Sequence, residues 1–292
     1  MSGSERIDEP RVVELRAGAL RLALRPDLGA CIAGLWCADL PVLASSDPAR
    51  LDTAWPSACF ALAPYSNRLG HRQFQWQGQP YRTALNHPRS ALHSRHGVAW
   101  AHGWRLLSAT GSEAVLEYQH STDADWPFAF NLQQRVLLAG DHLLLGLSLR
   151  NTDSRNQPAG LGWHPYFVKR AHSHLQIALG GRWDSDSATE LPTTRQPHAG
   201  IDAEVAALGL DHCFDGWAGA ARIDDEALSL KLTSSLPYLV VFTPSDKPFF
   251  CVEPVSHVNN ALNMADPAAL GVRALAPGET IDAWMRLDIA LA

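Results

Sequence analysis

Short runs of alternating apolar and polar residues, separated by turn-forming residues, constrain the fold of this chain more than any other feature. Residues 131–138 and 142–150 alternate in this way on either side of Ala139-Gly140-Asp141. The pair predicts a β-hairpin, because strand side chains alternate between two faces and a glycine-containing turn reverses the chain. Further strands are expected at residues 12–15, 20–24, 29–37, 74–77, 80–83, 104–107, 114–119, 175–179, 228–232, 238–242, 249–255 and 281–290. Turn signals about every 8–12 residues predict an all-β sandwich or barrel.

The remaining segments add little regular structure to this prediction. Residues 260–270 are the best helix candidate, although Pro267 limits the helix. Residues 180–220 are polar and glycine-rich with weak periodicity, and residues 47–64 contain three prolines and predict a long loop. No repeat, low-complexity tract or linker divides the chain. We therefore expect a flexible leader at residues 1–10 and one large domain at residues 11–292.

Composition excludes several classes of function. The chain has 292 residues, a net charge of -6 and no basic block, so nucleic acid and anionic membranes are not expected partners. The amino terminus lacks the apolar core of a signal peptide, and no apolar run reaches membrane-spanning length. Five cysteines without a Cys-x-x-Cys pair favour reduced thiols in a cytoplasmic protein over disulfides or zinc. The ten tryptophans are typical of a protein with flat, sugar-binding surfaces.

The stretch from Gly160 to Phe167, Gly-Leu-Gly-Trp-His-Pro-Tyr-Phe, contains a candidate catalytic histidine. Pro165 restricts the backbone of His164, and the flanking aromatic residues restrict its side chain. An imidazole held in this way can act as a general acid or base. By itself the stretch is more typical of a core histidine with a single hydrogen bond.

Two further stretches place a charged side chain among apolar residues. Glu253 ends the apolar run Phe249 to Val252 and precedes a proline, so partial desolvation should raise its pKa toward that of a useful base. Asp211 follows an apolar residue and could accept hydrogen bonds from two sugar hydroxyls. The alternatives are a strand-end glutamate that reaches solvent and an aspartate that caps a turn.

Two loop stretches contribute candidate binding groups. Arg68 lies in a loop bounded by proline and glycine, and its guanidinium could hold ligand hydroxyls, although a surface turn would explain it too. His93, His96 and His102 are spaced His-x2-His-x5-His. This spacing lacks a nearby acidic ligand and differs from the helical His-Glu-x-x-His pattern, so no metal site is expected.

Taken in order, these stretches resemble the aldose 1-epimerase (mutarotase) family. The family pattern runs Asn-Arg, His-Gly, His-Pro-Tyr-Phe, Asp and Glu-Pro. Here it corresponds to Asn67-Arg68, His96-Gly97, His164 to Phe167, Asp211 and Glu253-Pro254. The resemblance extends over nearly the whole chain. It implies a large β-sandwich, the galactose mutarotase-like supersandwich, with a groove for a monosaccharide.

The resemblance also implies a reaction and a role for each residue. Members of the family interconvert the α and β anomers of a sugar by opening and reclosing its ring, without metal or organic cofactor. Glu253 corresponds to the base that acts on the C1 hydroxyl, and His164 corresponds to the acid that acts on the ring oxygen. His96 would orient the sugar and stabilise the developing oxygen charge, with His93 as the alternative for that position. Substrate hydroxyls would be held by Arg68, Asp211 and Asn67, and Trp100 would stack on a sugar face.

Other functions remain open at this point. A hexose-6-phosphate 1-epimerase is a close alternative, but its relatives have an arginine where this chain has Trp100. A non-catalytic sugar-binding protein would not need both His164 and Glu253. A β-sandwich domain of a lyase or glycosidase is disfavoured by the short chain. We expect a monomer or homodimer that acts on a free monosaccharide.

Overall fold

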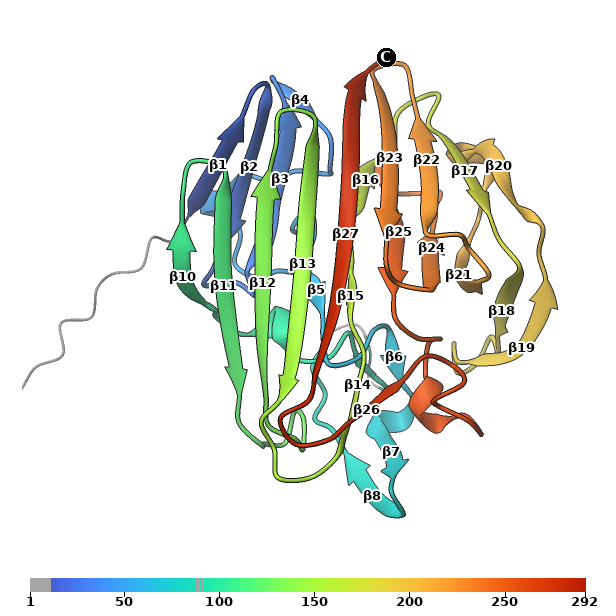
Figure 1. The fold of residues 1–292 in the computed structure, drawn as a ribbon. Coiled ribbons are helices and arrows are strands. Elements are labelled where there is room, and N and C mark those ends of the chain that lie inside the picture. Colours follow the sequence, from blue (N-terminus) through green and yellow to red (C-terminus); the bar gives the residue numbers. More distant parts are fainter. Residues whose placement is uncertain (1–11, 88–89, 91) are drawn as a thin grey trace, which may run out of the picture.

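The strands form two layers that pack face to face (Figure 1). The computed structural model describes residues 12–87, 90 and 92–292, so the expected leader at residues 1–10 lies outside the described residues. One layer is a long nine-stranded sheet. The other consists of a four-stranded sheet behind one half of it and an eight-stranded sheet behind the other half.

The nine-stranded sheet has long and regular strands. Its order is β10-β11-β12-β13-β27-β23-β22-β17-β20, and all neighbours are antiparallel. The strands are β10 (Arg105–Ala109), β11 (Glu113–His120), β12 (Phe130–Leu138), β13 (His142–Asn151), β17 (His174–Ala178), β20 (Gly200–Glu204), β22 (Ala220–Asp224), β23 (Leu228–Ser234) and β27 (Thr280–Leu291).

The second layer contains the four-stranded and eight-stranded sheets. The four-stranded sheet, in the order β1-β2-β3-β4, comprises β1 (Val13–Ala17), β2 (Leu20–Arg25), β3 (Cys31–Cys37) and β4 (Leu40–Pro41). The eight-stranded sheet runs β19-β18-β21-β24-β25-β15-β5, and β16 also pairs with β25. Its strands are β5 (Ala61–Leu62), β15 (Gly162–Trp163), β16 (Tyr166–Val168), β18 (Gly181–Ser185), β19 (Pro192–Pro197), β21 (Asp211–Asp215), β24 (Tyr238–Phe242) and β25 (Phe249–Val255).

Short ladders and turns lie at the end of the sandwich shown lowest in Figure 1. The ladders are formed by β6 (Arg68–Leu69) with β9 (Ser94–Arg95), β7 (Gln73–Trp76) with β8 (Gln79–Arg82), and β14 (Gln157–Ala159) with β26 (Arg273–Leu275). Helical structure in the described residues is limited to the 3-10 turns η1 (Pro48–Arg50), η2 (Gly70–Arg72), η3 (Ala99–Ala101), η4 (Val205–Ala207) and η5 (Ala261–Asn263). None of these is long and apolar enough to cross a membrane.

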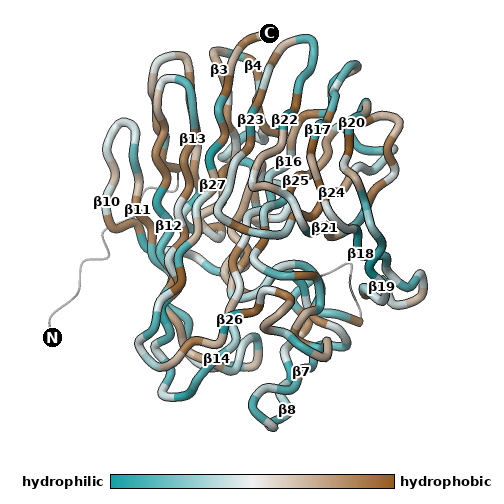
Figure 2. The backbone as a smooth tube through the Cα atoms, turned by 45° about the vertical axis from the view of Figure 1, so that its right-hand side comes forward, coloured by the Kyte–Doolittle hydropathy of each residue, from teal (hydrophilic) through white to brown (hydrophobic). Residues whose placement is uncertain are grey.

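The core lies between the two layers and follows from the alternation of the long strands. In β13 every second residue from Leu143 to Leu149 is buried, and in β27 the same holds from Ile281 to Ile289. Each buried leucine or isoleucine contributes about 1.5–3 kcal/mol. Hydrophobic residues accordingly follow the sheets in Figure 2, whereas β18, β19 and the β7–β8 hairpin are mostly hydrophilic.

The structure confirms the all-β prediction and most of the expected strands. The predicted helix at residues 260–270 is wrong, because the segment forms only the short turn η5. Asn260 has a left-handed φ of 58° there, which does not continue a helix. The strands β18 to β21 lie in the region of weak periodicity, where no strand was predicted. Most residues of β18 and β19 are half-buried or exposed, so their sequence does not alternate between apolar and polar.

Candidate active site

Glu253 is a carboxylic acid placed in the interior by a central strand. It lies on β25, which pairs with β24, β15 and β16, and the residue is only 2% exposed. Its Oε2 atom has no hydrogen-bond partner among the residues that the structure describes. Burial raises the pKa of Glu253 well above its usual value, with the charge of Asp211 acting in the same direction and that of Arg68 opposing it. A buried carboxyl group with an unused oxygen is poised to bind a ligand or exchange a proton.

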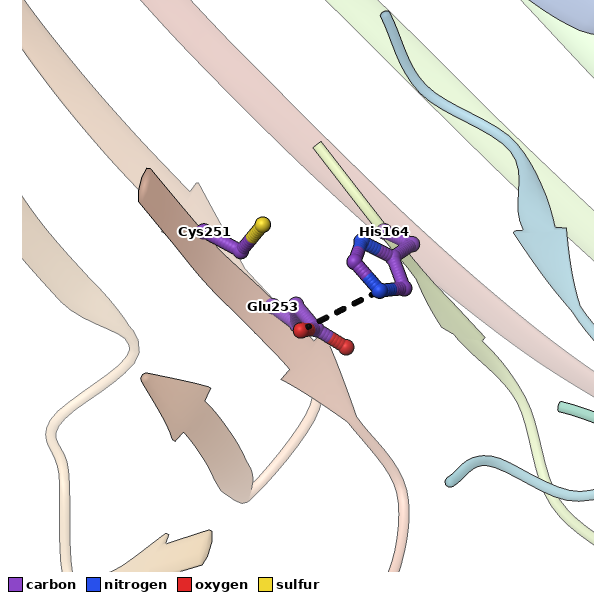
Figure 3. Close-up of side chains that lie close together, drawn as sticks. All are labelled: His164, Cys251 and Glu253. Atoms are coloured by element: carbon purple, nitrogen blue, oxygen red, sulfur yellow. Dashed lines mark ion pairs between the residues drawn. The ribbon is translucent and has the colours of Figure 1, made fainter. Parts of the chain in front are cut away.

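His164 faces Glu253 from the turn between β15 and β16. Its backbone N–H donates to the Phe60 carbonyl, and its ring stacks on Tyr166 with centroids 4.5 Å apart. The Nε2 atom lies 3.5 Å from Oε1 of Glu253 (Figure 3). Burial lowers the pKa of His164 to about 3, because the charged imidazolium is poorly solvated there. When the pair holds a single proton, the carboxyl group is therefore the favoured site for it.

His96 reaches the same site from a loop that the Asn67 segment fixes. The backbone N–H of His96 donates to the Asn67 carbonyl, and the backbone N–H of Asn67 donates to Nδ1 of His96. This arrangement places the ring proton on Nε2 when the imidazole is neutral. Burial and the nearby His164, whose ring centroid is 5.1 Å away, lower the pKa of His96 well below its usual value. His96 is therefore a neutral hydrogen-bond donor.

Gly97 explains why a glycine follows His96. Its φ is +67°, and a Cβ atom there would lie 2.0 Å from the Ala63 carbonyl oxygen. The close approach lets the backbone N–H of Val98 donate to that same oxygen. Only glycine fits this conformation and this contact without displacing the backbone, so the His-Gly pair fixes the position of His96.

Arg68 and Asp211 form the polar side of the site. The Arg68 guanidinium donates to Oδ1 of Asn67 and to Glu190, and its Nη2 lies 3.8 Å from Oδ2 of Asp211. Arg68 is buried, whereas the Asp211 side chain is about half exposed at the start of β21. Fixed guanidinium donors beside a carboxylate suit a ligand that carries several hydroxyl groups.

A cavity of about 810 Å³ brings these residues together. It is lined by six of the seven residues expected from the sequence, namely Asn67, Arg68, His96, His164, Asp211 and Glu253. A larger hollow of about 1060 Å³ lies over β17, β20, β22, β23 and β27, but none of the expected residues lines it. The smaller cavity, with its buried acid and imidazole, is the candidate active site.

Trp100 does not occupy the position that was expected for it. It is not among the residues that line the cavity; its ring packs against Phe60 and Trp55, and its indole N–H donates to the Arg95 carbonyl. The half-buried Trp55 lines the cavity instead, with its ring 6.1 Å from that of His164. Trp55 lies in the loop at residues 47–64, and its position between apolar and proline residues was the only signal in the sequence.

His93 and His96, the two candidates for the loop position, have different surroundings. His93 does not line the cavity. Its Nδ1 accepts a hydrogen bond from the His71 backbone, so its Nε2 donates to the Thr189 carbonyl. Both ring nitrogens of His93 are thus used by the backbone, and His96 is the loop histidine that faces His164.

One group of side chains in the described part of the chain has donor atoms close enough to hold a metal. His164, Cys251 and Glu253 place one such atom each within 4.8 Å of one another (Figure 3). Burial raises the pKa of the Cys251 thiol well above its usual value, and a protonated thiol is a poor ligand. His93, His96 and His102, the three closely spaced histidines of the sequence, are not brought together in such a group. The site fits an acid–base pair better than a metal centre.

The fold is that of the galactose mutarotase-like proteins. The sequence profile of the family described as aldose 1-epimerase matches residues 11–288. The chain therefore belongs to the aldose 1-epimerase family, as its motifs predicted.

Similar proteins and solved structures cover nearly the whole chain. The uncharacterized protein YphB of Escherichia coli K12 is 29% identical over 95% of this chain and 98% of its own length. A crystal structure of a candidate aldose 1-epimerase from the same organism has a TM-score of 0.86 at 26% identity, covering 96% of this chain and 99% of that one. The galactose 1-epimerase of Lactobacillus acidophilus shares the fold, with a TM-score of 0.78 at 16% identity over 99% and 97% of the two chains.

Proposed function

We propose that this protein is an aldose 1-epimerase that interconverts the α and β anomers of a free monosaccharide. The observation that carries the proposal is the buried pair of Glu253 and His164, 3.5 Å apart, whose pKa values are shifted in opposite directions by burial. Two groups that share one proton at low cost are what a reversible ring opening requires.

In the proposed ring opening, the Glu253 carboxylate removes the proton of the C1 hydroxyl and the C1–O5 bond breaks. The electrons of the O–H bond form the C1 carbonyl, and O5 takes a proton from the His164 imidazolium. The open-chain sugar rotates about C1–C2, and the reverse transfers close the ring on the other face. Ring opening leaves both groups neutral, which is the state that burial favours. Transfer of one proton from the Glu253 carboxyl group to His164 converts the neutral pair into the carboxylate and imidazolium that react.

The other residues of the cavity hold the sugar. His96 donates from Nε2 to an oxygen that gains charge, while Arg68, Asp211 and Asn67 bind the remaining hydroxyl groups. Trp55 takes the stacking position that had been expected for Trp100. Neutral imidazoles at positions 96 and 164 keep the site free of excess positive charge when no substrate is present.

In this proposal the reaction needs no metal or cofactor. We also propose a cytoplasmic location, because of the state of the cysteines. All five cysteines are buried and unpaired, which suits a reducing compartment.

Polarimetry with freshly dissolved α-galactose, α-glucose and α-glucose 6-phosphate tests the proposal. The rotation of a neutral sugar should reach equilibrium faster in proportion to protein concentration, and kcat/KM should be lower for the phosphate. Binding of the sugars without any acceleration would instead assign a non-catalytic sugar-binding role. A clear preference for the phosphate would assign hexose-6-phosphate 1-epimerase activity.

A further inference from the structure

Two arginines meet at one side of the cavity and share a single carboxylate. Arg68 and Arg95 are directly opposite each other in the ladder formed by β6 and β9, so their side chains are forced to be neighbours. Both line the cavity, and their side chains are only 9% and 17% exposed. Oε2 of Glu190 accepts from Nε of Arg68 at 3.1 Å and from Nη2 of Arg95 at 3.2 Å.

This arrangement balances the charge of the arginine pair. Burial and the charge of Arg68 lower the pKa of Arg95, so the two cations are costly to hold together without an anion. Glu190 supplies one negative charge, and Asp211, 3.8 Å from Arg68, supplies a second. Among the described residues, nothing accepts a hydrogen bond from the buried Nε of Arg95, so the pair retains an unused donor there. Without Glu190 the cavity would carry an excess positive charge and a free donor.

Glu190 is held in place by its own loop. The loop joins β18 to β19, and Glu190 has a left-handed φ of 56°. Its backbone N–H donates to the Asp186 carbonyl at 2.7 Å. The neighbouring Thr189 carbonyl accepts from Nε2 of His93 at 2.7 Å, which ties the loop to the backbone beside Arg68. The carboxylate is therefore presented by an anchored turn, although its side chain is 56% exposed and open to exchange.

We propose that Glu190 is a specificity-determining residue, which neutralises the Arg68–Arg95 pair so that the cavity selects neutral sugars over sugars with an anionic substituent. The inference rests on the proposed function for its choice of substrates. A carboxylate or phosphate on the sugar would have to displace Glu190 from both arginines, because the pair otherwise offers the geometry and charge that bind such anions. A neutral sugar makes no such demand.

The first test compares kcat/KM for galactose with that for glucuronate and glucose 6-phosphate in the wild type and in Glu190→Gln. In the variant, the ratio of kcat/KM for an anionic sugar to kcat/KM for galactose should rise by about tenfold or more, which corresponds to about 1.4 kcal/mol. The carboxylate and phosphate substrates show which anion the freed pair accepts. The ratio is decisive, because Glu190 also orients Arg68 and its loss can lower the rate for every sugar.

Asp246→Asn is the matched control. Asp246 lines the same cavity but pairs with the exposed Lys247, so its substitution removes one negative charge without freeing a buried arginine. An equal gain in Asp246→Asn would mean that overall charge, and not the arginine pair, sets the preference. The additional change Arg95→Ala should cancel the gain of Glu190→Gln.

A second test measures inorganic phosphate binding by calorimetry, which does not depend on catalysis. Glu190→Gln should bind phosphate at least tenfold more tightly than the wild type or Asp246→Asn, and the binding should weaken as salt is added. This result holds even if no sugar is epimerised, so the two proposals can fail separately. Equal phosphate affinity in the wild type and Glu190→Gln, or a wild type that already prefers anionic sugars, would overturn the role of Glu190.

Discussion

Two buried glutamates, one in each layer of the sandwich, have carboxyl groups in very different surroundings. Glu117 on β11 of the nine-stranded sheet accepts hydrogen bonds from Arg105, Asn131 and Gln119. The hydrogen bonds from Arg105 and Asn131 are the main causes that lower the pKa of Glu117 to about 2. Glu253 on β25 of the other layer has a raised pKa and an oxygen without a hydrogen-bond partner in the described part of the chain. The first carboxylate stabilises its sheet, and the second is kept available.

The same contrast extends to the backbone around each glutamate. Glu117 lies in a regular ladder with β12 in which every residue from Glu113 to His120 is paired. The loops that face Glu253 contain the left-handed, non-glycine residues Asn67 and His96. Such conformations are costly and are typical of functional sites. The nine-stranded sheet supplies stability, and the short strands and loops of the other half carry the proposed chemistry.

The largest expected effect comes from exchanging each glutamate for glutamine. Glu253→Gln should lower kcat/KM by about 10²–10⁴-fold while sugar still binds, because the proton acceptor is lost. Glu117→Gln should retain activity near that of the wild type. Polarimetry and a sugar-binding titration on both variants measure the difference, and near-wild-type turnover by Glu253→Gln would remove that residue from the mechanism.

The second expected effect is a bell-shaped pH profile of kcat/KM. A second proton on the pair abolishes its base, and loss of the single proton abolishes its acid. Because burial lowers the pKa of His164 and raises that of Glu253, the acidic limb should lie below the usual imidazole pKa and the basic limb above the usual carboxyl pKa. The apparent values belong to the pair. His164→Gln should have very low activity and a displaced basic limb, whereas a wild-type profile with neither limb over the whole pH range in which the protein stays folded would contradict the two-group assignment.

The third expected effect separates two tryptophans. Trp55→Ala should raise KM by about tenfold, or 1.4 kcal/mol, because a flat wall of the cavity is removed. Trp100→Phe should change KM little, since Trp100 lies behind Trp55. Steady-state kinetics on both variants tests this, and the reverse order of effects would restore the stacking role first expected for Trp100.

A smaller effect concerns stability, where the two glutamates should have opposite signs. The pKa of Glu117 is lowered, so its contribution is present above the unfolded carboxyl pKa and is lost as pH falls through the folded one. Glu117→Gln should therefore cost about 1–3 kcal/mol near neutral pH and less in acid. The pKa of Glu253 is raised, so the wild type loses stability as pH rises from the unfolded carboxyl pKa toward the folded one.

Glu253→Gln removes that penalty and should be at least as stable as the wild type at neutral pH, with a lead that grows as pH rises. Thermal unfolding at several pH values checks both variants, and 1 kcal/mol corresponds to about 2–4 °C in Tm. If Glu117→Gln and Glu253→Gln shifted Tm in the same direction at every pH, the proposed contrast between the two glutamates would be wrong.

Removal of metal by a chelator should have the smallest effect of all, both on activity and on thermal stability. Prolonged treatment with a strong chelator should change neither activity nor Tm, because acid–base chemistry by His164 and Glu253 needs no metal. Metal analysis of the purified protein accompanies the assay. A stoichiometric metal that is lost together with activity would contradict the proposal.

The long strands of the nine-stranded sheet were easier to predict from the sequence than the loops around the site, for physical reasons. Long strands such as β12, β13 and β27 have one buried and one exposed face, so their alternation is visible in the sequence. The site motifs were recognisable because glycine and proline fix their loops. Which tryptophan faces the cavity was not predictable, because η3 turns Trp100 inward and burial in a loop has no period. Glu190 was also missed, because its contact with Arg68 spans 122 residues of chain and arises only in the folded protein.

The central claim is that the buried pair of Glu253 and His164 interconverts anomers, and magnetisation-exchange NMR on an equilibrium mixture of α- and β-galactose tests it most directly. The wild type should increase the exchange between the two C1 protons in proportion to its concentration. Glu253→Gln and His164→Gln should give little exchange above the spontaneous rate, while Glu117→Gln should match the wild type. The absence of exchange with the wild type across a panel of free aldoses, or equal exchange in all four proteins, would contradict the claim.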